Sequence, residues 1–284
     1  MMLGLVAACG RSPIELEGDQ GFGAASRFDG GDDEDADDEG PREQLCREVD
    51  FLFVIDDSAT MAQYQAQVVE NHEVFIDGVR DAVDSIETMH IGVVTTERYT
   101  ANITDCEQPG GLLVRTDPGG GVQECGPYKD GHNYMTERDN LEIDLRCALE
   151  VGTPGTDHDA PLGAALAAIS APLSDPGACN DGFFTPGALL VLVIVSDGYP
   201  TEYPSDLDPY FASVSIAAQA GSYDDVVVVL FASTEESPCL NPLIPALGDF
   251  AGTFPHSFVG AICEHDWSGP FFEAVDVVKG ACPS

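Results

Sequence analysis

The chain has 284 residues, of which 44% are hydrophobic, so it is long and apolar enough to fold around a substantial core. Its 11 Lys and Arg stand against 50 Asp and Glu, a formal net charge of −39. This excludes nucleic-acid binding and electrostatic docking on anionic lipid, because both depend on clustered Lys and Arg. The longest apolar run, residues 188–195, is far shorter than the roughly 18 residues of a membrane-spanning helix.

The distribution of the acidic residues leaves two interpretations open. Residues 1–40 hold 11 acids and 2 bases, a net −9 of the total −39, so residues 41–284 carry −30. A domain this acidic repels itself, and salt or divalent cations relieve the repulsion. One interpretation is a solvated acidic surface, and the other is a set of specific calcium sites. Asp33, Asp35 and Asp37 have calcium-loop spacing, but Asp38 and Gln44 stand where such a loop needs Gly and Glu.

The first 45 residues predict an exported, tethered protein. Val6-Ala7-Ala8-Cys9 resembles the bacterial lipobox, in which small residues precede a cysteine that is lipidated. The apolar stretch before it is short, so we expect residues 1–9 to be a remnant of a lipoprotein signal whose true start lies upstream. Residues 10–45, rich in small residues and then in acids, are predicted to be a flexible acidic tether. The expected location is the bacterial cell envelope, with membrane contact only through the lipid anchor at Cys9.

The cysteine count supports an oxidising compartment. With Cys9 set aside, eight cysteines remain in the predicted domain at 46–284, an even number that suits four disulfides. No two are spaced C-x-x-C, which argues against zinc ribbons and thioredoxin-type redox motifs. The sequence alone does not fix connectivity. We expect Cys46–Cys282 to join the ends and Cys106–Cys125 to close a long loop, with Cys147–Cys179 and Cys239–Cys263 following by elimination.

Apolar patterning predicts alternating strands and helices along the domain. Strands are predicted at 49–55, a mostly apolar run, at 90–96, and at 188–195 and 226–232, which are apolar on both faces. Helices are expected at 61–86, 161–170, 207–220 and 271–278. This alternation predicts an α/β fold, a doubly wound and mostly parallel sheet flanked by helices and stapled by disulfides. Residues 97–140 form a long connection, which is unusual unless it is stapled or functional.

Oxygen-bearing side chains follow the first and third predicted strands. Asp56, Ser58 and Thr60 occupy alternate positions of one turn, and Asp197 stands in the S-D-G turn after residue 195. Thr153 and Thr156 precede the helix predicted at 161–170. In open α/β sheets ligands gather at the carboxyl ends of the strands. Carboxylate and hydroxyl oxygens there indicate a site for a hard divalent cation.

These residues resemble the metal-ion-dependent adhesion site of the von Willebrand factor type A (vWA) family, over roughly residues 46–282. Asp56, Ser58 and Thr60 match its Asp-x-Ser-x-Ser turn, with Thr in place of the second Ser, and Asp197 matches its T/S-D-G aspartate. Thr156 is the best match to its distant threonine, with Thr153 as the alternative. The stretches VGTPG…PL at 151–162, DGFF at 181–184 and CEHDWS at 263–268 are similar to cysteine-containing versions on bacterial lipoproteins.

The resemblance implies a function in binding. It implies a bound Mg²⁺ (or Mn²⁺ or Ca²⁺) held by Asp56, Ser58, Thr60, Thr156 and Asp197, with one coordination position completed by the carboxylate of a protein partner. The expected protein is therefore a lipid-anchored adhesion module with no enzymatic activity. The alternatives are a surface scaffold with a purely structural metal site and a metal-dependent phosphatase-like hydrolase.

Other sequence patterns give weaker indications of function than the adhesion-site residues do. Asp, Ser and Thr after the first strand also cap helices, a role compatible with metal binding. A phosphatase of the haloacid-dehalogenase type needs a second carboxylate where Ser58 stands. His72-Glu73 begins like the zinc-protease motif H-E-x-x-H, but residue 76 is Ile, so we expect His72 to have no special role. The nucleophile elbow G-x-S-x-G and the phosphate loop G-x-x-x-x-G-K are both absent from the sequence.

Overall fold

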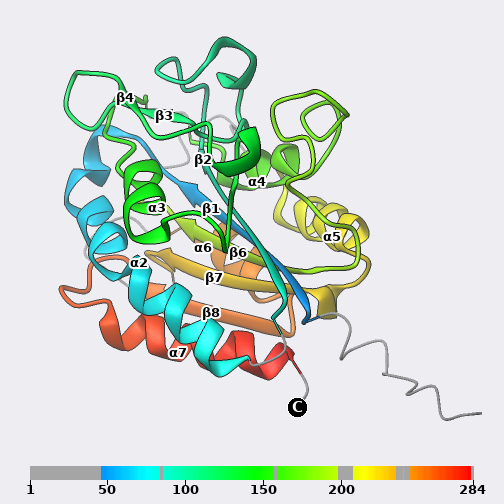
Figure 1. The fold of residues 1–284 in the computed structure, drawn as a ribbon. Helices are drawn as coiled ribbons and strands as arrows, with labels where there is room; N and C mark the ends of the chain where they lie inside the picture. Colours follow the sequence, from blue (N-terminus) through cyan, green and yellow to red (C-terminus); the bar gives the residue numbers. More distant parts are fainter. Residues whose placement is uncertain are drawn as a thin grey trace, which may run out of the picture. The chain divides into compact units, whose positions relative to one another are not determined.

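A six-stranded sheet forms the centre of the fold in a computed structural model (Figure 1). The structure describes residues 46–83, 86–156, 159–197, 207–234, 239 and 244–282. The strand order is β5-β2-β1-β6-β7-β8, in which β5 is antiparallel to β2 and every other pair is parallel. The strands are β1 (Glu48–Ile55), β2 (Thr88–Thr95), β5 (Met135–Thr136), β6 (Leu189–Val195), β7 (Val226–Ala232) and β8 (His256–Ala261).

Helices cover both faces of this sheet, as Figure 1 shows. One face packs against α2 (Ala62–Ala82), α3 (Leu141–Leu149) and α7 (Ser268–Ala281). The other face packs against α4 (Pro161–Ala168), α5 (Pro209–Ala220) and α6 (Pro245–Ala251). Because β6 and β7 are buried along their whole length, their sequences are apolar at every position. The predicted doubly wound, mostly parallel α/β fold is confirmed.

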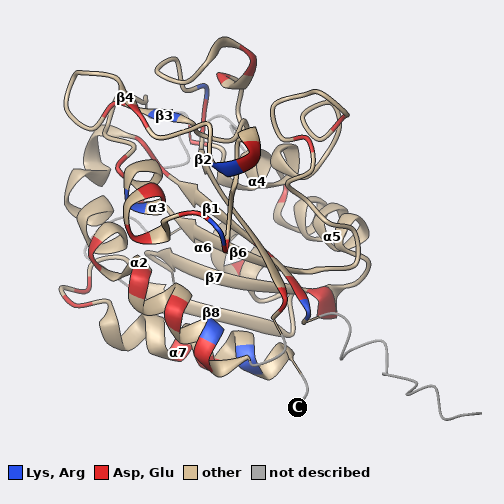
Figure 2. Ribbon diagram, viewed as in Figure 1, with Lys and Arg blue, Asp and Glu red and all other residues tan. Residues whose placement is uncertain are grey.

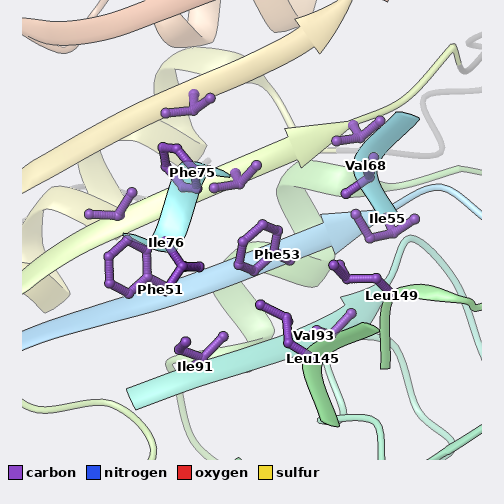
Figure 3. Close-up of a cluster of buried hydrophobic side chains, with 14 of the residues drawn as sticks. Phe51, Phe53, Ile55, Val68, Phe75, Ile76, Ile91, Val93, Leu145 and Leu149 are labelled. Carbon is purple, nitrogen blue, oxygen red and sulfur yellow. The ribbon is translucent and has the colours of Figure 1, made fainter. Parts of the chain in front are cut away.

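The face under α2 and α7 has an aromatic core. Phe75 of α2 lies edge-on to Phe51 and Phe53 of β1, with ring centroids 6.1 and 6.4 Å apart, and Figure 3 shows these rings among the aliphatic side chains of the sheet. Phe271 of α7 lies 5.2 Å from Phe75, and Trp267 stacks on Phe231 of β7 at 4.2 Å. These contacts fix α2 and α7 on the sheet and so fix the turn that leads into α2.

Strand registry brings the carboxyl ends of three strands together. Ile55, the last residue of β1, pairs with Thr95 of β2 and with Val195 of β6. The segments that follow these strands therefore leave the sheet at the same edge, and those after β2 and β6 each lie about one strand spacing, roughly 4.8 Å, from the one after β1. The candidate residues after β1 and β6 are neighbours for this reason.

The structure adds elements that the apolar patterns did not predict. Helix α3 lies just beyond the long connection, while α6 and β8 lie between the last predicted strand and helix. Short strands β3 (Arg115–Thr116) and β4 (Gln123–Glu124) form a separate two-stranded sheet inside the connection. Single 3₁₀ turns occur at η1 (Ala59–Met61), η2 (Thr104–Cys106), η3 (Lys129–Gly131) and η4 (Tyr223–Asp225). The predicted helix at 61–86 ends earlier, at Ala82.

Four disulfides staple the domain, and two of the expected pairings are wrong. Cys46–Cys282 and Cys239–Cys263 form as expected. In place of Cys106–Cys125 and Cys147–Cys179, the structure pairs Cys106 with Cys179 and Cys125 with Cys147. The reason is the path of the connection, whose two cysteines pack on opposite faces of the sheet, Cys106 on the side of α4 and Cys125 on the side of α2 and α3. Each therefore pairs with a cysteine on its own face.

Several predictions fall outside the described residues. They concern the signal remnant at 1–9, the lipidated Cys9, the tether at 10–45 and the part of the S-D-G turn at 198–201. Within the described part of the chain, no helix has the length and hydrophobicity needed to cross a membrane.

Candidate metal site

Asp56 is the buried centre of the turn after β1. Its side chain is 0% exposed and its backbone N–H donates to the Val195 carbonyl, which ties the turn to the end of β6. Oδ1 accepts a hydrogen bond of 2.8 Å from the backbone N–H of Ser58, and Oδ2 accepts one of 2.6 Å from the hydroxyl of Ser196. Both carboxylate oxygens are thus held in fixed directions.

Two hydroxyls and a second carboxylate extend this arrangement toward solvent. Ser58 Oγ lies 3.2 Å from Thr60 Oγ1, and the Thr60 hydroxyl donates to Asp197 Oδ1 at 2.9 Å. Asp56, Ser58, Thr60, Ser196 and Asp197 form one hydrogen-bonded group, which we call the strand-end cluster. Four of the five predicted metal ligands lie in it, because β1 and β6 are adjacent.

The fifth predicted ligand, Thr156, has a different partner. Its hydroxyl donates to Glu97 Oε2 at 3.0 Å, and its backbone N–H donates to Glu97 Oε1. The preceding residue, Gly155, donates its N–H to the carbonyl of Asp57 at 3.0 Å, so the loop lies over the turn after β1. Thr153, the alternative, is exposed on the same loop. The ligand role of Thr156 stays a prediction.

Three acidic residues at this edge were not predicted to belong to the site. Asp57 is 0% exposed, and neither of its carboxylate oxygens has a hydrogen-bond partner among the described residues. Asp159, 7% exposed, accepts a hydrogen bond of 2.8 Å from Thr96 and is hydrogen-bonded to Asp56. Glu97 follows β2 and holds Thr156. The doubled aspartate directly after a buried strand was a signal for Asp57, whereas the positions of Glu97 and Asp159 depend on loop paths.

The concentration of carboxylates raises their pKa values in the metal-free protein. Burial raises the pKa of Asp57 to about 7, with added repulsion from Glu97 and Asp56. Burial and the charge of Asp56 raise the pKa of Asp159 to about 8. Burial also raises the pKa of Asp197, against the hydrogen bond from Thr60 that lowers it. The edge therefore carries more buried acid than its own hydrogen bonds stabilise, and a bound cation would offset this excess.

The donor set fits a hard cation. Neighbouring oxygens in an octahedral Mg²⁺ shell, each about 2.0–2.1 Å from the ion, lie about 3 Å apart. The separations Ser58–Thr60 and Thr60–Asp197, 3.2 and 2.9 Å, match this spacing. Across the described ranges no group of three or more His, Cys, Asp or Glu side chains is arranged to hold a metal ion. A group of those four residue types contains no hydroxyl, whereas two of the four matched ligands here, Ser58 and Thr60, are hydroxyl side chains.

The raised pKa values predict that the metal-free protein loses stability as pH rises. An unfolded aspartate titrates near pH 3.9, so between there and about pH 7 to 8 the folded state keeps protons on Asp57 and Asp159 that the unfolded state has released. The contribution of these two protonated carboxyl groups to the free energy of unfolding is fully present below about pH 4 and lost by about pH 8. In EDTA, the free energy of unfolding should therefore fall between pH 5 and pH 8. Asp159→Asn should flatten this slope, and an unchanged slope would show that Asp159 is not a source of it.

Comparison with known proteins gives distant structural likenesses only. No protein-family model matches the sequence, and no curated protein matches it significantly. A structure of proximal thread matrix protein 1 (PTMP1) from the mussel byssus is 16% identical, with a TM-score of 0.44, over 84% of this chain and 47% of that one. Another PTMP1 structure, described as having a zinc-occupied MIDAS motif, is 16% identical, with a TM-score of 0.40, over 84% and 46%. Human COPII-coat protein Sec24c is 12% identical, with a TM-score of 0.39, over 82% and 33%. The chain thus spans less than half the length of each, and likenesses at this level carry no argument about function.

Proposed function

We propose that this chain is a vWA-like binding module that engages a protein partner through a divalent cation at the strand-end cluster. The observation that supports the proposal is the convergence of Asp56, Ser58, Thr60 and Asp197 from two adjacent strands, with oxygen separations suited to one ion. The proposed activity is binding of the partner without chemical conversion.

The side chains of the cluster divide the work of holding the ion. Asp56, whose carboxylate oxygens accept hydrogen bonds from Ser58 and Ser196, would orient the turn, and the hydroxyls of Ser58 and Thr60 would offer oxygen ligands to the cation. Asp197, half-buried and hydrogen-bonded to Thr60, would supply a carboxylate ligand. When bound, Mg²⁺ supplies a positive charge and a coordination position that a partner's carboxylate can occupy.

This charge matters because the rest of the surface repels acidic groups. Figure 2 shows Asp and Glu distributed over helices and loops, with few Lys and Arg between them, in keeping with the net charge of −39. An acidic partner would therefore be repelled at long range and attracted only at the ion. We expect binding to strengthen as salt screens the repulsion, the reverse of an association between opposite charges.

A capture experiment tests the proposal. The immobilised protein should retain its partner from an envelope extract in millimolar Mg²⁺ and release it in EDTA, and Asp197→Ala should retain none in either buffer. Asp249→Ala, which removes an exposed carboxylate on α6, is the matched control and should behave as wild type. Capture that is equal in Mg²⁺ and EDTA would favour the surface scaffold, whose metal is structural only.

We also propose that the module is lipid-anchored in the bacterial cell envelope through Cys9, on the strength of the lipobox-like V-A-A-C and the acidic tether that follows it. Expressed with a complete upstream signal, the protein should partition into detergent, and Cys9→Ser should stay in the aqueous phase. Equal partitioning of the two would contradict the anchor.

A further inference from the structure

Asp57 is a buried carboxylate that the strand-end cluster does not use. Its side chain is 0% exposed, yet neither carboxylate oxygen has a hydrogen-bond partner among the described residues. Buried polar atoms in folded proteins are almost always satisfied, and an orphaned one points to a water or an ion. Burial of an unpaired carboxylate is costly, which makes a cation the stronger candidate.

Glu97 faces Asp57 across the loop at residues 152–156. A Cβ placed on Gly155 would lie 2.8 Å from Asp57 Cγ and 2.8 Å from Glu97 Oε1, so both carboxyl groups border the same point. The loop can pass this close to the two carboxyl groups only because residue 155 is a glycine. Two charged carboxylates this close to one point repel each other, and a cation bound beside them would offset the repulsion.

The surroundings of this pair offer further oxygen atoms. Both oxygens of Glu97 contact Thr156, one through the backbone N–H and one through the hydroxyl, which places the hydroxyl oxygen at the pair. The Asp57 carbonyl, which accepts the N–H of Gly155, borders the same loop, and Glu97 is half-buried, so solvent reaches its side of the pair. No Lys or Arg has an ion pair with either carboxylate among the described residues.

We propose that Asp57 and Glu97 form a second cation site, for Ca²⁺, beside the strand-end cluster. Ca²⁺ takes six to eight oxygens, including carboxylates, carbonyls, hydroxyls and water, in flexible geometry, which suits an irregular loop better than the strict octahedron of Mg²⁺. The bound ion would join the end of β1, the end of β2 and the loop that carries Thr156.

Thermal melts in an Asp197→Ala background separate this site from the strand-end cluster. Ca²⁺ at about 100 times its Kd should raise the melting temperature of Asp197→Ala by roughly 5 to 10 °C relative to EDTA. The rise should be absent from Asp197→Ala combined with Glu97→Gln, and absent again with Asp57→Asn. Asp197→Ala combined with Glu142→Gln, which removes an exposed carboxylate on α3, should keep it.

The effect of Glu97→Gln on the melting temperature should change sign between EDTA and Ca²⁺, which gives a second readout. In EDTA, adding Glu97→Gln should raise the melting temperature, because it removes a like charge facing Asp57, whereas in Ca²⁺ it should lower it. A Ca²⁺ response that is absent from Asp197→Ala, or equal with and without Glu97, would overturn the proposal, the latter by showing adventitious binding to the acidic surface. Neither outcome touches the Mg²⁺ response of the strand-end cluster, so the proposed function would still stand.

Discussion

Millimolar Mg²⁺ should raise the melting temperature of the wild-type protein and leave that of Asp197→Ala unchanged. A ligand that binds only the folded state at 100 times its Kd adds about 2.7 kcal/mol to the free energy of unfolding. For a domain of this size that corresponds to a rise of roughly 5 to 10 °C. Asp197 contributes one of the two carboxylates that close the strand-end cluster, so its loss removes a ligand and the partner of Thr60.

The comparison is made by melting both proteins in Mg²⁺ and in EDTA at constant ionic strength, because added salt alone relieves repulsion in an acidic domain. Asp249→Ala, exposed on α6, should respond to Mg²⁺ like wild type. Asp197 lies at a strand end outside the apolar core, so in EDTA the variant should still unfold cooperatively. Equal Mg²⁺ responses in wild type and Asp197→Ala would place the ion elsewhere.

Phe271→Ala should be far more destabilising than Phe272→Ala, although the two residues are neighbours on α7. Phe271 is 0% exposed and its ring lies 4.9 Å from that of Phe231 and 5.2 Å from that of Phe75. Truncating a buried Phe costs about 3–5 kcal/mol, through lost burial and the cavity that remains. Phe272 is 59% exposed, so its truncation should stay within about 0.5 kcal/mol.

Denaturant unfolding with the disulfides intact measures both variants, and equal slopes with denaturant concentration would show that only stability has changed. Each substitution replaces Phe by Ala in the same helix, so the gain in helix propensity is shared and cancels in the comparison. Similar losses for the two variants would mean that α7 does not pack on the sheet through Phe271.

The central strands could be predicted because burial on both faces leaves a simple apolar signal. The runs ending at Ile55, Val195 and Ala232 match β1, β6 and β7 almost to the residue. Strand β8 lies at the edge of the sheet and is only partly buried, so its sequence HSFVGA mixes polar and apolar residues and gives no such run. Helix α3 has only nine residues and exposes one of its apolar side chains, Ile143, so its sequence shows no clear apolar face.

The candidate site shows the same division between local and long-range information. Asp56, Ser58 and Thr60 could be predicted from one turn, and Asp197 joins them because β6 pairs with β1, although β2 lies between these strands in the sequence. The hydrogen bonds of Thr156 with Glu97 depend on the path of the loop between α3 and α4, which lies over the turn after β1. The long connection after β2 places Cys106 and Cys125 on opposite faces of the sheet, which the number of residues between them does not reveal.

The disulfide between Cys46 and Cys282 sets the route that mechanical tension takes through the domain. Cys46 stands just before β1 and Cys282 just after α7, with Cα atoms 5.7 Å apart and a sequence separation of 236. A force applied at these two residues is carried by the covalent sulfur bridge, and the enclosed chain, with the sheet and the strand-end cluster, is a closed loop that bears no load. The site should thus keep its geometry when the protein is pulled at these residues. Once the bridge is reduced, tension passes directly into the start of β1.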